Sequence, residues 1–175
     1  MLLTKRGVAF ALCAGWLLAS WPSMARERGS LPRRVCPGGV APAGAGPAEA
    51  APASVFLRVA SVAGVRISLG VAPGVDRFCV TPTAVVFGPG DLDAASAAGR
   101  IAYAIGVWAA WRGQNARGAE VKAASHAGCL LARLGVFGDD LTTQVVDVRD
   151  WSGPHRDARR FTRAVRGGYA ACVAR

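Results

Sequence analysis

The chain has 175 residues, and its 21 Lys and Arg residues outnumber its 11 Asp and Glu residues, which gives a formal net charge of +10. This length suffices for one domain with one hydrophobic core. Nineteen of the basic residues are arginine. Such a charge fits either a soluble protein with an arginine-coated surface or a protein with an anionic partner, such as nucleic acid or a cell-envelope polymer.

The first 25 residues are typical of a secretory signal peptide. Lys5 and Arg6 form a positive start, residues 7–20 are apolar, and residues 23–25 place small side chains where signal peptidase recognises them. The apolar stretch is shorter than the roughly 20 residues needed to cross a bilayer. We therefore expect residues 1–25 to be cleaved, leaving a periplasmic or extracellular chain without a transmembrane span. An uncleaved N-terminal anchor is the alternative.

After residue 25, the composition and hydrophobic pattern of the chain differ before and after residue 54. Residues 26–53 are rich in Pro, Gly and Ala and have no hydrophobic period, which predicts a flexible tether. Residues 54–175 are expected to form a single domain. Its first part contains β-branched or alternating runs separated by Gly and Pro, which predict a small antiparallel sheet or pair of hairpins; these runs are residues 54–60, 65–71, 77–82 and 83–88.

Beyond residue 90 the hydrophobic pattern becomes helical. Asp93 and Asp140 are expected to cap the first and third helices, and Gly135 to end the second. The expected helices cover residues 94–111, 116–134, 141–150 and 156–173. Together these elements predict an α+β fold, in which a small antiparallel sheet is followed by three to four helices.

Four cysteines follow residue 25, and none belongs to a CxxC pair, so a zinc knuckle is not expected. An even number of cysteines in an exported chain predicts two disulfides, for which three connectivities exist. Cys172 lies on the apolar stripe of the last predicted helix, and Cys129 lies beside the stripe of the second. A Cys129–Cys172 bridge between two packed helices is therefore reasonable, and it leaves Cys36 and Cys79 as the second pair.

Residues that could carry catalysis are sparse. Neither His126 nor His155 has a second ligand at helical spacing, and no serine stands in a nucleophile motif. An active hydrolase with a non-standard site is an alternative. It would require Asp139, Asp140, His155 and Asp157 to converge on one cleft.

Four segments, taken in order, resemble the bacterial neutral zinc metallopeptidase family, a zincin-like group of secreted or membrane-anchored proteins. Tyr103 and Gln114 match the family's active-site helix, and Tyr169 and Cys172 match its closing pattern. The segments are RFCVTPTAVVFGPGDL (77–92), IAYAIGVWAAWRGQ (101–114), SHAGCLLARLGVFGDD (125–140) and HRDARRFTRAVRGGYAAC (155–172). The resemblance implies a zincin-like α+β scaffold in an exported protein.

The chain departs from that family where the family's chemistry lies. The family binds zinc through H-E-x-x-H on one helix, where two imidazoles hold the metal and the Glu takes a proton from bound water. Here Ile105, Gly106 and Ala109 stand at those positions, and the third ligand falls near Ala124. The resemblance therefore implies a degenerate member without zinc, without the catalytic Glu and without any other cofactor.

Two kinds of function follow from these patterns. The leading expectation is an exported, catalytically inactive homologue that acts as a binding or structural protein. The alternative is a basic protein that binds anionic polymers through the last helix. The partner of such a basic protein would be an anionic envelope polymer. The inactive homologue could bind either such a polymer or another protein. The candidate anion-binding residues are Arg156, Arg159, Arg160, Arg163 and Arg166.

Overall fold

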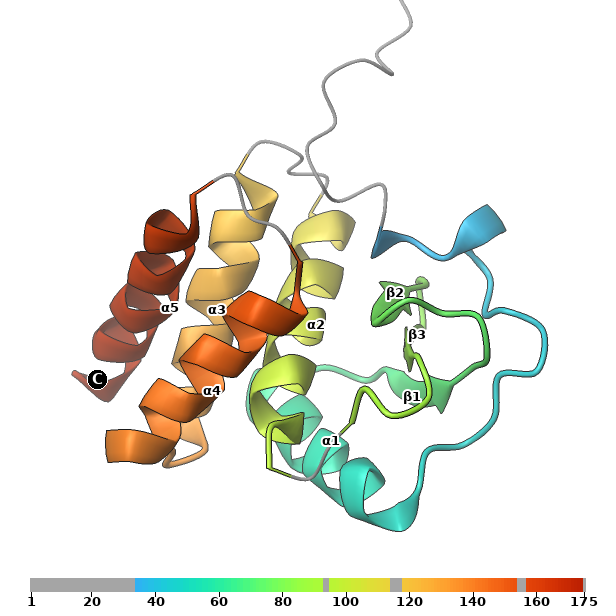
Figure 1. Cartoon of the computed structure of the whole chain (residues 1–175), viewed down its shortest axis with the longest axis horizontal. Helices are drawn as coiled ribbons and strands as arrows, with labels where there is room; N and C mark the ends of the chain where they lie inside the picture. The colour runs from blue at the N-terminus through green and yellow to red at the C-terminus, as the bar shows by residue number, and fades with distance from the viewer. Residues whose placement is uncertain (1–33, 93–94, 114–117, 154–156, 175) are drawn as a thin grey trace, which may run out of the picture.

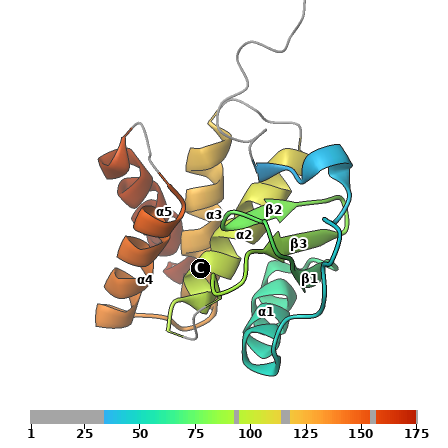
Figure 2. The same ribbon diagram turned by 45° about the vertical axis from the view of Figure 1, so that its right-hand side comes forward.

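The structure, a computed structural model, describes residues 34–92, 95–113, 118–153 and 157–174. These residues form five α-helices and a three-stranded sheet, which confirms the α+β class. Helix α2 lies at the centre, between the sheet with α1 on one side and the other three helices on the other (Figures 1 and 2). None of the described helices is long and apolar enough to cross a membrane.

The first helix was not predicted. Residues 54–60, expected as a strand, lie within helix α1, which spans Ala50–Ala63. Its buried side chains include Phe56, Val59 and Ala60, which follow the i, i+3, i+4 spacing of a helix face rather than the alternation of a strand. The β-branched residues of this run favour a strand locally, but packing of this face in the core outweighs that preference.

Residues 26–53 were predicted to form a tether; residues 26–33 lie outside the described residues, and the prediction is wrong where residues 34–53 contact the sheet or belong to a helix. Helix α1 begins at Ala50, and residues 34–49 are held against the sheet rather than free. Val35 forms a β-bridge with Val80 of the sheet, and Gly46 forms one with Val71. A short 3-10 helix spans Pro37–Gly39 between these contacts. Such pairing through main-chain groups leaves no hydrophobic period in the sequence, so the composition alone indicated a tether.

The sheet has the strand order β1-β3-β2, with β1 at Ser68–Val71, β2 at Phe78–Val80 and β3 at Ala84–Phe87. Strands β2 and β3 form the expected antiparallel hairpin, but β1 pairs with β3 in parallel. A purely antiparallel sheet is therefore the wrong prediction. The chain crosses from β1 to the far edge and returns through the hairpin, so β1 and β3 run in the same direction.

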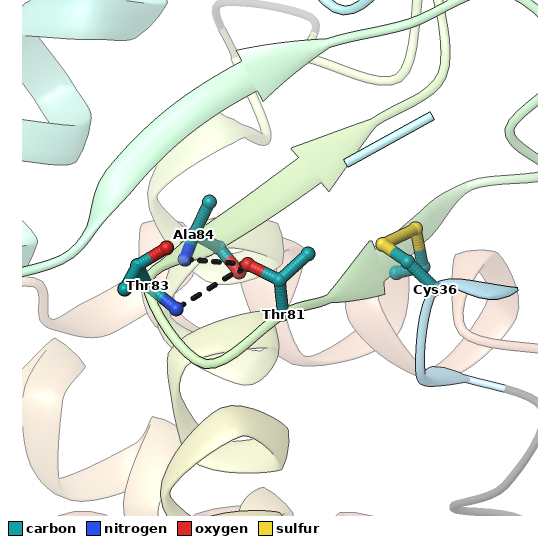
Figure 3. Close-up of a disulfide and its surroundings, with 5 residues drawn as sticks. Cys36, Thr81, Thr83 and Ala84 are labelled. Carbon is teal, nitrogen blue, oxygen red and sulfur yellow. Dashed lines mark hydrogen bonds between the residues drawn. A yellow bond between two sulfur atoms is a disulfide. The ribbon is translucent and has the colours of Figure 1, made fainter. Parts of the chain in front are cut away.

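Thr81 fixes the turn of this hairpin (Figure 3). Its Oγ1 accepts hydrogen bonds from the main-chain nitrogens of Thr83 at 3.3 Å and Ala84 at 2.9 Å. Beside the turn, the Cys36–Cys79 disulfide ties the N-terminal segment to β2. The two cysteines belong to a small buried cluster at the sheet, and this cluster is separate from the main core.

The four later helices occur in the predicted order, with shifted ends. Helix α2 has Ser96 rather than Asp93 at its N-cap, and Asp93 lies outside the described residues. Asp140 lies in the first turn of α4 instead of capping it, because that helix begins at Gly138. Gly135 follows α3 with φ 74°, as expected of a helix-ending glycine. The helices are α2 (Ala97–Arg112), α3 (Ala119–Arg133), α4 (Gly138–Trp151) and α5 (Ala158–Val173).

Helices α3 and α5 pack with their backbones in close contact. Gly128 of α3 faces the main chain of Val165, and Gly168 of α5 faces the main chain of Ser125, so a Cβ at either glycine would overlap a carbonyl oxygen. The Cys129–Cys172 disulfide joins the same two helices, with 5.2 Å between the Cα atoms. Both predicted pairings are therefore present.

Candidate functional site

The positions that the resemblance would assign to a zinc motif lie on helix α2, in or against the core. Ile105 has 0 % of its surface exposed, and Ala109 is partly buried beside it. Gly106 packs on α3 so closely that a Cβ there would lie 2.6 Å from the main-chain oxygen of Ala123. The nearby Trp108 is also buried, and its indole N–H donates a hydrogen bond of 3.3 Å to the oxygen of Pro82.

The position expected for a third zinc ligand is equally closed. Ala124 is fully buried on α3, and the neighbouring helices pack directly against this part of the helix. Within the described parts of the chain, no group of three or more His, Cys, Asp or Glu residues is placed to hold a metal ion. The motif positions of α2 thus contribute apolar packing and no ligand.

The carboxylates expected to form a non-standard hydrolase site do not converge on one cleft. Asp139 and Asp140 lie in the first turn of α4, whereas Asp157 caps the start of α5 and accepts a hydrogen bond from the main-chain nitrogen of Arg160 at 2.9 Å. The 14 residues of α4 make it about 21 Å long, and α5 begins after its far end. His155 lies outside the described residues.

His126 lies half-buried on α3. Burial lowers the pKa of its imidazole, and the positive charge of Arg133 lowers it further. The imidazole is therefore neutral at pH 7. Among the described residues it belongs to no group of three or more His, Cys, Asp or Glu side chains that could hold a metal ion.

A basic groove of about 450 Å³ is lined by residues of helices α4 and α5, which contact each other. Arg159, Arg163 and Arg166 follow the i, i+4, i+7 spacing, so they form one row along α5. The row extends about 10.5 Å along the helix. The groove is lined by Arg149, Ala158, Arg159, Thr162, Arg163 and Arg166. We call this surface the arginine groove.

The sequence identified three of the four arginines of this groove. Arg149, from the last turn of α4, was missed, because its position opposite the row depends on how the two helices pack. Its guanidinium is bonded to Asp150 at 2.7 and 3.1 Å, and this hydrogen bond raises its pKa. Arg160, although on the same helix, does not line the groove, and Arg156 lies outside the described residues.

The chemistry of the arginine groove suits an anion with several charges. Its described lining contains no carboxylate, although the adjacent Asp150 holds the guanidinium of Arg149, and Ala158 and Thr162 contribute only small side chains. Arg159, Arg163 and Arg166 are exposed and form no ion pair with a described residue. No aromatic side chain of the described residues lines the groove, so this lining offers charge and hydrogen bonds rather than a surface for stacking bases.

Comparison of the chain with protein-family models, with curated proteins and with solved structures gives no match. The resemblance to neutral zinc metallopeptidases therefore stays a prediction from the sequence.

Proposed function

We propose that the protein is an exported, non-catalytic binding protein that holds anionic polymers in the arginine groove. The observation that carries this proposal is the convergence of four arginines from two helices on one groove. A polymer with a charge on each repeat unit would meet the row on α5 at several points, with Arg149 on the opposite side. The guanidinium group favours such partners because it presents several N–H donors to phosphate or sulfate oxygens.

The experiment compares the binding of fluorescein-labelled polyphosphate to the purified protein and to two variants. The groove variant carries Arg159→Gln, Arg163→Gln and Arg166→Gln. A charge-matched control carries Arg58→Gln, Arg66→Gln and Arg160→Gln, which removes three exposed charges outside the groove.

The groove variant is expected to bind about 100-fold more weakly in 50 mM salt, because each lost contact contributes about 1 kcal/mol and 1.4 kcal/mol is a factor of ten. The control should bind within about threefold of the unchanged protein. Equal losses in the two variants would show that net charge, and not the groove, attracts the polymer.

The resemblance to zinc metallopeptidases supports the non-catalytic part of the proposal. The positions of the family's two zinc-binding His residues would then hold Ile105 and Ala109, and that of its catalytic Glu would hold Gly106; all three pack in or against the core. We expect the purified protein to contain no stoichiometric zinc by elemental analysis and to leave casein intact. Stoichiometric zinc together with proteolysis that a chelator abolishes would contradict this.

A further inference from the structure

Two arginines from distant parts of the chain meet beside the end of helix α4. A Cβ on Gly153 would lie 2.5 Å from Nη1 of Arg77 and 3.6 Å from Nη2 of Arg34. Because both distances start from the same point, the two nitrogens are at most 6.1 Å apart. Gly153 has φ 104°, a conformation that favours glycine, and any side chain there would displace Arg77. The main chain here leaves room for two guanidiniums.

Neither guanidinium has a carboxylate within hydrogen-bonding distance among the described residues. The nearest to Arg77 is Asp76, 4.0 Å from Nε, and its side chain is 89 % exposed, so this surface pair contributes little. Arg34 stacks over the ring of Phe78 at 4.8 Å from its centroid. Burial lowers the pKa of Arg34, and the charge of Arg77 adds to this effect. Two like charges are therefore held close together, and the one carboxylate that the described residues place within 4.0 Å of either guanidinium is that of the exposed Asp76.

The backbone at Arg77 is itself unfavourable. With φ 66°, Arg77 is the one non-glycine residue in the described parts of the chain that has a positive φ. A long side chain in this left-handed region strains the main chain, and glycine would relieve the strain. Residues held in such conformations cluster at functional sites, where the required side chain outweighs the cost.

Stabilisation of helix α4 accounts for only part of this arrangement. The main-chain oxygen of Ser152, the C-cap residue, accepts a hydrogen bond from Nη2 of Arg34, and the negative end of a helix attracts cations. One arginine meets that need. A second arginine in a strained conformation adds repulsion to a helix end that is already capped.

We propose that Arg34 and Arg77 together bind one oxyanion group, a carboxylate or a phosphate, of a small ligand. An oxyanion between the guanidiniums would accept hydrogen bonds from both and would offset their repulsion. Arg77 is 33 % exposed at its side chain, so a ligand can reach it from solvent. Neither residue lines the arginine groove, so this site is independent of the function proposed for the groove.

The test measures thermal unfolding of the protein in which the groove is already disabled by Arg159→Gln, Arg163→Gln and Arg166→Gln. Inorganic phosphate and acetate are titrated separately, with chloride keeping the ionic strength constant. The proposal predicts a saturable rise in the unfolding temperature with phosphate, with acetate or with both, and the anion that responds identifies the group. Adding Arg77→Gly or Arg34→Gln should weaken binding and so raise the half-saturating anion concentration at least tenfold.

Arg77→Gly also separates binding from folding. Without an anion it should unfold at the same temperature as its parent or higher, because glycine suits φ 66°. A lower unfolding temperature would show that Arg77 serves the fold and would overturn the proposal. So would the absence of a saturable response to both anions, or a response that survives Arg77→Gly. Arg77→Gly decides the question even if Arg34→Gln fails to fold.

Discussion

Replacing Gly106 by Ala tests whether the zinc-motif positions of α2 are closed by packing. A Cβ there would lie 2.6 Å from the oxygen and 3.0 Å from the Cα of Ala123, so the obstacle is main chain and cannot rotate away. Normal contacts need about 3.5 Å, so α2 and α3 would have to separate by up to about 1 Å. Overpacking of this kind costs about 1–3 kcal/mol, against a gain of about 1 kcal/mol in helix propensity. We expect a net loss of about 1 kcal/mol.

The assay is urea unfolding of the purified protein with its disulfides intact. Gly167→Ala is the matched control, because Gly167 is an exposed position of α5 with nothing within 4 Å of its Cβ. The control should gain about 1 kcal/mol from helix propensity. If Gly106→Ala gained as much as Gly167→Ala, α2 would have room at this position, and the claim that packing closes the site would be refuted.

Two further predictions concern the fold. Replacing Cys129 and Cys172 together by Ser opens a loop of 43 residues, and should lower the free energy of unfolding in urea by about 4 kcal/mol in the chain-entropy model; an unchanged midpoint would contradict the stabilising role of this disulfide. The lowered pKa of His126 means that the unfolded chain takes up a proton first as the pH falls. Stability should therefore decrease below about pH 6.5, and His126→Gln should remove part of that decrease in thermal unfolding between pH 7 and pH 5. Identical pH profiles for both proteins would contradict this.

The sequence predicted correctly those parts of the fold that depend on the spacing of hydrophobic residues within one or two neighbouring elements. The stripe from Phe161 to Cys172 marks one face of α5, and it led to the correct pairing of Cys172 with Cys129. The hairpin of β2 and β3 was likewise expected from two short apolar runs. Each of these features follows from the period of the hydrophobic residues over one or two elements.

The parts that the sequence missed depend on contacts between distant segments. The run around Phe56 contains Val55 and Val59, which favour a strand, and its burial against the core outweighs that preference. Gly46 and Val35 are held by main-chain pairing with the sheet, which composition does not reveal. Arg149 joins the arginine groove only because helices α4 and α5 pack together, and Arg34 comes close to Arg77 because its segment pairs with β2.

The salt dependence of polyphosphate binding tests the central claim most directly. Each phosphate contact made by an arginine contributes roughly 0.7–0.9 to the slope of log K against log salt concentration. We expect the slope to be measured between 50 and 500 mM salt, a range of about one decade. Its magnitude should decrease by about 2 when Arg159, Arg163 and Arg166 are replaced by Gln. The charge-matched control with Arg58, Arg66 and Arg160 replaced should keep the original slope. The same slope for all three proteins would contradict binding in the arginine groove.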